Sequence, residues 1–172
     1  MTGKNYGFTA PFRSLDPAWI DYNGHLNMAH YLVLFEEGAE TFWHTLGLGD
    51  GYRDATGHTT YTASAKIDYI AEVAADAQVS VHTILRDVGP KKFLIWQGLF
   101  TPDGTLRASC ETLTLHVDQT GDTPKVAPFG GPIMETLHAK LADHAHLVPP
   151  NTTGLPVQMN RPAADKLKVK ES

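Results

Sequence analysis

The clearest hydrophobic pattern in the chain has the spacing of an α-helix. Between residues 27 and 46, apolar side chains recur every three or four positions, and Gly47 follows where a helix commonly ends. The run 32–35 is apolar nearly all round, so we expect that end of the helix to be deeply buried. The pattern predicts one long helix over 27–46. Its apolar positions are Met28, Tyr31, Leu32, Phe35, Ala39, Phe42, Trp43 and Leu46.

Beyond a glycine-rich loop over 47–57, the spacing of apolar residues changes to two. In "TYTASAKIDYI" (60–70), every second residue from Tyr61 through Ile67 to Tyr69 is apolar or aromatic, and the residues between them are polar. This alternation predicts a strand with one buried and one solvent-exposed face. Segments 77–88, 91–100 and 106–118 continue this pattern, separated by the turn signals "GP" (89–90) and "PDG" (102–104). A short first strand is expected over 8–13 and a second helix over 132–146.

The order of these elements favours an α+β fold. One apolar helix follows a first strand and precedes four antiparallel strands, so we expect the sheet to wrap around the helix. A chain of 172 residues with 42% apolar and 19% charged residues is typical of one globular domain. We place that domain at 1–147. Residues 148–172 contain proline, glycine and lysine with little periodicity, so they are expected to form an extended tail.

Charge and cysteine content limit the partners. A formal net charge of -5 and the lack of a basic stripe argue against nucleic acid, and no segment approaches the ~20 apolar residues of a membrane span. The single cysteine, Cys110, rules out a disulfide framework within the chain, and no secretory signal is evident. We therefore expect a cytoplasmic protein. Nine histidines are present without an H-E-x-x-H arrangement, so no metal is expected.

A dense polar cluster precedes the long helix. The segment "DYNGHLN" (21–27) places Asp21, His25 and two asparagines around one turn, with Gly24 suited to a positive φ. One interpretation is structural, because Asn23 or Asn27 can cap the helix. The other is chemical: free amides at the helix start can hold an oxyanion while Asp21 activates water or attacks directly. No G-x-S-x-G motif is present, which argues against a serine hydrolase.

The same segment carries a family resemblance. "DYNGHLNMAHYLVLFEEGAETF" resembles the signature of hotdog-fold acyl-CoA thioesterases of the 4-hydroxybenzoyl-CoA thioesterase type, and "KIDYIAEVAADAQVSV" is similar to the strand-turn-strand of that family. Together the resemblance covers about residues 8–120. The motif positions are Asp21, Gly24, His25, Asn27, Tyr31, Phe35 and Glu36. Two positions depart from the family, where Trp19 replaces a frequent second Asp and Ala71-Glu72 replaces a usual Pro.

The resemblance implies a fold and a mechanism. An antiparallel sheet would wrap a long central helix, and two protomers, or a dimer of dimers, would share their active sites. Asp21 would be the nucleophile or the general base, with no cofactor. Amides near Asn27 and Met28 would polarise the thioester carbonyl, and His25 would orient the turn or the thioester.

A narrower resemblance concerns the acyl group. "WIDYNGHLN", "CETLTLHVD" and "DHAHLVPP" together resemble thioesterases of carnitine degradation, which cleave betainyl-CoA. A quaternary ammonium group favours aromatic faces and a carboxylate. The substrate-binding candidates are Trp19, Tyr22, Tyr31, Tyr61 and Glu111, with Trp43, Tyr69, Trp96 and Glu36 as further choices.

Other functions stay open on the same scaffold. An aryl- or short-chain acyl-CoA thioesterase and a non-catalytic acyl-CoA binder both fit the fold. A hotdog dehydratase is a further alternative, but the acid-base pair that it would need is not identifiable in this sequence.

His116 alternates with Leu115 and Val117, so we expect it on the solvent-exposed or dimer-facing side of its strand.

Overall fold

The long helix has the ends that the sequence predicts. In the computed structural model, which describes residues 6–150, helix α1 spans Met28–Leu46. The side chain of Asn27 accepts a hydrogen bond from the amide of Ala29, and Gly47 ends the helix in the left-handed conformation at φ 76°. That conformation carries little cost for glycine, so the sequence stops the helix there.

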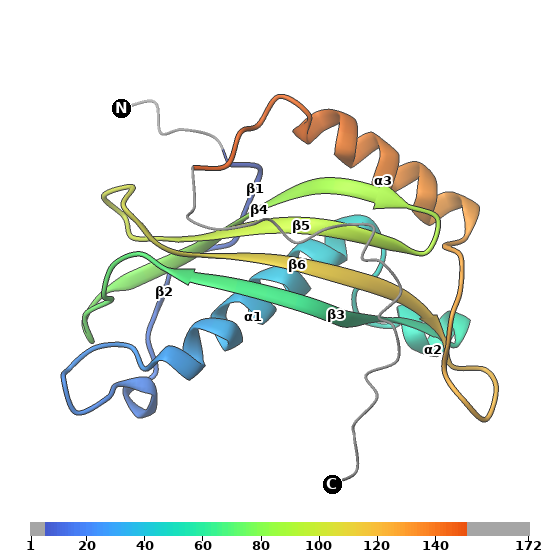
Figure 1. Cartoon of the computed structure of the whole chain (residues 1–172). Coiled ribbons are helices and arrows are strands. Elements are labelled where there is room, and N and C mark those ends of the chain that lie inside the picture. Colours follow the sequence, from blue (N-terminus) through green and yellow to red (C-terminus); the bar gives the residue numbers. More distant parts are fainter. Residues whose placement is uncertain (1–5, 151–172) are drawn as a thin grey trace, which may run out of the picture.

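One antiparallel sheet curves around α1 (Figure 1). Its main strands are β3 (His58–Tyr69), β4 (Gln78–Gly89), β5 (Lys92–Phe100) and β6 (Leu106–Asp118), and the strand order is β1-β4-β5-β6-β3. Short strands complete it: β1 (Phe8–Thr9) and β2 (Arg13–Ser14) pair with β4, and β7 (Lys125–Val126) pairs with β6. Strand β3 is therefore the end of the order, with only β6 beside it among the described strands.

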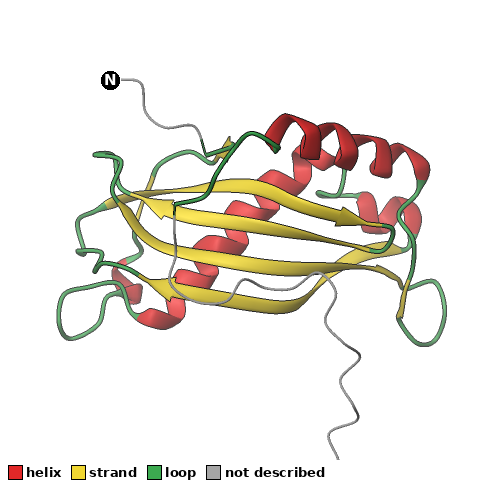
Figure 2. Cartoon of the chain, turned by 45° about the horizontal axis from the view of Figure 1, so that its top comes forward, coloured by secondary structure: helices red, strands yellow, loops and turns green. Residues whose placement is uncertain are grey.

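Three further helices, each short or peripheral, occur in residues 6–150. The 3-10 helix η1 (Pro17–Trp19) precedes α1, and α2 (Tyr52–Thr56) follows it. Helix α3 (Gly131–His144) contacts β4 and the C-terminal part of α1, and Figure 2 shows it beside the sheet. The predicted α+β arrangement is thus confirmed, including the order of its elements.

Close packing fixes α1 on the sheet. Leu34, Phe35 and Phe42 are almost fully buried against strand residues such as Val81 and Ile95. A Cβ atom at Gly38 would lie 2.6 Å from the Cβ of Val81, far inside contact distance. Glycine at this position therefore allows the helix to approach β4 closely.

The opposite face of the sheet carries a separate apolar cluster. Ile84, Trp96 and Phe100 pack there with Leu147, which follows α3. Both faces of the central strands are covered. In β5 and β6, side chains that point to either face of the sheet are therefore buried. Cys110 is one of these, and burial raises the pKa of its thiol to about 11. It is a small buried side chain, as its position in a strand predicts.

The structure corrects several predictions about the secondary elements. The first strand is two short strands, and the glycine-rich loop contains the helix α2. No residue of β3 is fully buried, because β3 lies at the sheet edge and carries a register shift between Thr62 and Ser64. Leu32 is half-exposed, although its neighbours Leu34 and Phe35 are buried as expected. The predicted tail lies outside the described residues from position 151 onward.

His116 is also placed differently from the prediction. It is buried, with its Nε2 2.8 Å from the Tyr52 hydroxyl and its Nδ1 3.0 Å from the carbonyl oxygen of Ala127. Its ring stacks on that of His58, with the ring centroids 5.1 Å apart. Alternation along a strand identifies two faces, but it does not reveal that both are covered.

Buried histidines give stability a pH dependence. His144 is only 4% exposed, and its Nδ1 accepts a hydrogen bond from the amide of Leu85, which requires that nitrogen to be unprotonated. Burial, together with the nearby charge of Lys140, lowers the pKa of His144 below its ordinary value of 6.5. The unfolded chain therefore binds more protons than the folded one as the pH falls through 6.5, and stability decreases in that direction.

We expect the free energy of unfolding to fall as the pH is lowered from about 7.5 to about 5.5. The fall should be shallower for His144→Gln, because glutamine keeps an acceptor for the Leu85 amide and does not titrate. Urea denaturation at both pH values measures the difference. His138→Gln, which alters an exposed histidine of the same helix, is the control. Equal pH dependence in wild type and His144→Gln would contradict this account.

Candidate active site

The polar cluster forms one tight turn before α1. Ile20 and Leu26 form a bridge, the amide of Asp21 donates to the His25 carbonyl at 2.9 Å, and the amide of Gly24 donates back to the Asp21 carbonyl at 3.0 Å. Gly24 adopts φ 80°, as the sequence predicts. Backbone hydrogen bonds therefore hold the two ends of the turn together, and Asp21 is its one carboxylate.

The two oxygens of Asp21 have different surroundings. Oδ1 accepts from the amide of Asn23 at 2.8 Å and from the amide of His25 at 3.4 Å. Oδ2 has no hydrogen-bond or ion-pair partner within residues 6–150. One oxygen thus holds the carboxylate in place, and the other is available for chemistry.

The chain between β3 and β4 anchors this turn. The amide of Leu26 donates to the carbonyl of Val73 at 2.9 Å, and the amide of Ala75 donates to the carbonyl of Gly24 at 3.2 Å. His25 lies opposite Ala74, and its Nε2 is 3.6 Å from a carboxylate oxygen of Glu72. His25 is consequently held beside Asp21 and partly open to solvent.

The start of α1 leaves one amide available. The side-chain oxygen of Asn27 accepts a hydrogen bond from the amide of Ala29 at 3.0 Å. Its backbone carbonyl accepts one from the amide of His30, also at 3.0 Å. The amide of Met28 has no acceptor in the described part of the chain. Unpaired amides at a helix start carry the positive end of the helix dipole. The predicted residues Asp21, Gly24, His25, Asn27 and Met28 therefore lie together, with the Asp21 carboxylate and the Met28 N–H as the candidate reactive groups.

The predicted aromatic residues are placed unequally around this turn. The ring of Trp19 stacks on His30 at a centroid distance of 5.4 Å and lies 5.0 Å from the Arg13 guanidinium carbon. Tyr31 is buried and meets Tyr69 edge-on at 5.1 Å. Burial raises the pKa of Tyr31, so its hydroxyl stays protonated. These two aromatic residues belong to the elements that form the site.

Tyr22 also belongs to the turn. It is 97% exposed, which leaves its ring in solvent beside the turn. It is close to Asp21 along the chain, but no packing fixes its ring in the single chain.

Tyr61 and Glu111 lie on a different face of the molecule. Gln97 and its partner Cys110 face α1, so Glu111, which pairs with Trp96 one position along, faces the opposite side of the sheet. Tyr61 pairs with Leu115 on that side, and the side-chain Nε2 of Gln119 donates to its hydroxyl at 2.6 Å. The structure does not bring these two residues to Asp21.

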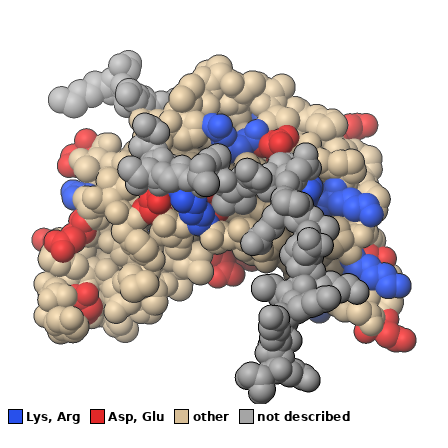
Figure 3. Space-filling view, viewed as in Figure 1, with Lys and Arg blue, Asp and Glu red and all other residues tan. Residues whose placement is uncertain are grey.

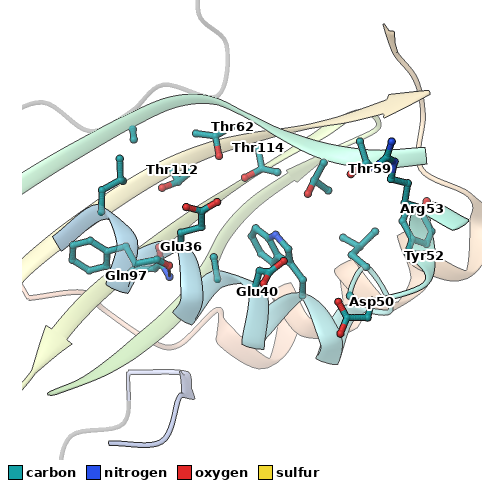
Figure 4. A pocket seen from close by; sticks show the side chains of 18 of the residues that line it. Glu36, Glu40, Asp50, Tyr52, Arg53, Thr59, Thr62, Gln97, Thr112 and Thr114 are labelled. Atoms are coloured by element: carbon teal, nitrogen blue, oxygen red, sulfur yellow. Dashed lines mark hydrogen bonds between the residues drawn. The ribbon is translucent and has the colours of Figure 1, made fainter. Parts of the chain in front are cut away.

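A cavity that sequence reasoning did not identify lies on the α1 side of the sheet. It measures about 640 Å³ and is bounded by α1, the loop that leads into α2, and strands β3 and β6 (Figure 4). Its lining combines acidic, aromatic and threonine side chains. These include Glu36, Glu40, Trp43, Tyr52, Thr62 and Thr114. The four-residue spacing of Met28, Leu32, Glu36 and Glu40 was the sequence signal for this surface.

The remaining surface features are less specific. Figure 3 shows positive and negative side chains interspersed over the visible part of one face. In residues 6–150, no group of three or more His, Cys, Asp or Glu side chains is arranged to hold a metal ion. No helix of the same region is long and apolar enough to cross a membrane.

Comparison with known proteins gives consistent matches. Residues 15–140 match the family model of the Thioesterase-like superfamily. The betainyl-CoA thioesterase of Pseudomonas aeruginosa is 34% identical over 139 residues, which cover 80% of this chain and 86% of that protein. The L-carnitine dehydrogenase/betainyl-CoA thioesterase of Agrobacterium fabrum is 33% identical over 132 residues, 74% of this chain and 27% of that longer protein.

Solved structures confirm the fold. A Staphylococcus aureus protein in complex with CoA aligns with a TM-score of 0.76 at 19% identity, covering 91% of this chain and 98% of that one. The DHNA-CoA thioesterase of Staphylococcus aureus aligns with a TM-score of 0.67 at 15% identity, covering 77% and 89%. The hotdog fold expected from the motif is therefore confirmed, and the chain belongs to the Thioesterase-like superfamily.

Proposed function

We propose that this protein is a thioester hydrolase that cleaves a small acyl-CoA, with betainyl-CoA as its substrate. The observation that carries the proposal is the pairing of an anchored carboxylate, Asp21, with the free amide of Met28 at the start of α1. The relatives named betainyl-CoA thioesterase support the choice of acyl group, and two-function relatives link it to carnitine degradation. A cytoplasmic location stays a prediction.

The geometry suggests how the thioester would react. The carbonyl oxygen would accept a hydrogen bond from the Met28 amide, which stabilises negative charge as the carbonyl carbon becomes tetrahedral. Oδ2 of Asp21 would either take a proton from the attacking water or attack the carbonyl carbon itself. In both cases the carbon–sulfur bond breaks and CoA leaves as the thiolate. In the second case an anhydride joins the acyl group to Asp21, and water then hydrolyses it to release the acid and restore the carboxylate. His25, held next to Asp21, would orient the thioester.

Replacing Asp21 separates chemistry from folding. In Asp21→Asn the side-chain carbonyl can still accept the amides of Asn23 and His25, so the turn should persist while the base or nucleophile is lost. We expect kcat/KM for betainyl-CoA to fall by roughly 10²–10⁴-fold. Release of free CoA thiol from a panel of betainyl-, acetyl- and benzoyl-CoA measures the effect.

The control is Asp21→Ala, which removes the carboxylate and also the acceptor in the turn. It should lose activity to a similar extent and, unlike Asp21→Asn, should also lower the free energy of unfolding by about 1 kcal/mol. Full activity in Asp21→Asn would contradict the assigned role. Hydrolysis of only neutral thioesters would discard betaine and keep the reaction, whereas CoA-ester binding without turnover would identify a non-catalytic binder.

We propose in addition that two copies assemble along β3. This strand has a free edge within the described residues, and such an edge invites pairing with another strand. Apolar side chains beside it are exposed: Met28 is 68% and Leu32 47% exposed, and Tyr69 and Ile70 are half-exposed. A second copy would cover these side chains and complete the site. The shared active sites implied by the family resemblance agree with this arrangement.

Sedimentation equilibrium at micromolar protein concentration tests the assembly. We expect a species of twice the 18.8 kDa chain mass, or of four times that mass if the dimers pair. A stable species of single-chain mass that retains thioesterase activity would contradict the proposed assembly.

A further inference from the structure

The cavity beside α1 is strongly acidic for a protein that would bind CoA. Glu36, Glu40 and Asp50 line it, and among the described residues of the lining Arg53 is the only positively charged one. Glu36 and Glu40 have no ion-pair partner in the described part of the chain. Figure 4 shows both side chains opposite the threonines of β3 and β6. The cavity therefore presents uncompensated negative charge.

One face of α1 connects the reactive end of the helix to this cavity. Met28, Leu32, Glu36 and Glu40 follow one another at four-residue intervals, which places them on one side of the helix. Leu32, at the rim of the cavity, is one turn beyond the Met28 amide, or about 6 Å along the axis. Glu36 is one turn further, and helical side chains tilt back toward the N-terminus. The first carboxylate beyond the amide is thus that of Glu36.

The cavity wall also contains an unsatisfied polar group. Thr114 is only 2% exposed and lines the cavity, and its hydroxyl oxygen has no hydrogen-bond partner among the described residues. Buried hydroxyls are normally hydrogen-bonded, so an unpaired one facing a cavity can bond to a ligand or to water that enters it. Trp43 adds an aromatic surface that is held in place by an edge-on contact with Phe93 at 5.0 Å.

This lining selects among the parts of an acyl-CoA. The phosphates of CoA are anions and would be repelled by the carboxylates. A neutral acyl group would gain nothing from the charge. A quaternary ammonium group has no N–H to donate, so it is recognised by carboxylate charge and by aromatic faces. The cavity offers carboxylate charge and an aromatic face. The apolar side chains of Met28 and Leu32 lie between these groups and the free amide.

We propose that this cavity is the acyl pocket and that Glu36 selects acyl groups that bear a quaternary ammonium. This proposal rests on the thioesterase function proposed above. The thioester carbonyl lies at the Met28 amide, and the short acyl group extends along α1 toward Leu32, so that its ammonium group faces the carboxylate of Glu36. Glu40, one turn further, adds to the negative potential from a greater distance. Glu36 is a specificity residue and takes no part in bond breaking.

Two isosteric substrates isolate the contribution of charge. Betainyl-CoA and 3,3-dimethylbutanoyl-CoA have the same shape, but a neutral carbon replaces the ammonium nitrogen in the second. The measured quantity is the ratio of their kcat/KM values, in which effects on CoA binding and on Asp21 cancel. We expect the wild type to prefer betainyl-CoA and Glu36→Gln to reduce the ratio by about tenfold. Glu40→Gln should reduce it less.

Glu135→Gln, which removes an exposed carboxylate on α3 away from the cavity, is the matched control and should leave the ratio unchanged. Turnover of the neutral isostere by Glu36→Gln shows that the variant is folded. An unchanged ratio in Glu36→Gln overturns the inference and leaves the thioesterase function standing. Equal kcat/KM for both substrates in the wild type overturns it without any variant. No turnover of either substrate by the wild type would instead overturn the proposed function.

Discussion

The hydrogen bonds from two backbone amides to one oxygen of Asp21 are the interaction on which the candidate site depends. They fix the turn at 20–26, and the amides of Leu26 and Ala75 in turn fix it to the chain between β3 and β4. The backbone therefore holds the carboxylate, and its second oxygen has no partner in the described part of the chain. A group that is oriented before the substrate arrives needs no reorganisation during the reaction. Asn27, which follows this turn, caps α1 through the amide of Ala29, and the Met28 amide has no acceptor within residues 6–150.

Much of the fold follows from local pattern. The three- and four-residue spacing over 27–46, with Asn27 before it and Gly47 after it, identified α1 and both of its ends. The failures concern what covers each face. β3 alternates as a half-buried strand does, but its position at the sheet edge depends on pairing with β6, about fifty residues away. His116 was expected on the solvent-exposed or dimer-facing side of its strand, but it is buried. Its strand, β6, lies inside the sheet, where both faces are covered.

The candidate site divides in the same way. Asp21, Gly24, His25, Asn27 and Met28 are nearly contiguous, so a motif reveals them together. The cavity joins residues of α1 to residues of β3 and β6, and no local pattern brings these three segments together. Tyr61 and Glu111 were candidates for the aromatic and the charged contact with an ammonium group, and strand register turns both away from α1. The regular spacing of Glu36 and Glu40 after Met28 was visible in the sequence, but its meaning depends on the strands opposite.

Placing the reactive end and the acidic cavity on one helix has an electrostatic consequence. The positive potential at a helix start is confined to about its first turn. Glu36 lies two turns beyond Met28, so its charge hardly competes with an oxyanion for the free amide. A negative charge closer to the amide would oppose the oxyanion that forms there. Leu32 occupies the intervening turn and separates the two potentials with an apolar side chain. With the roles proposed here, selection of the acyl group can therefore change through residues 36–43 without altering the chemistry proposed for Asp21.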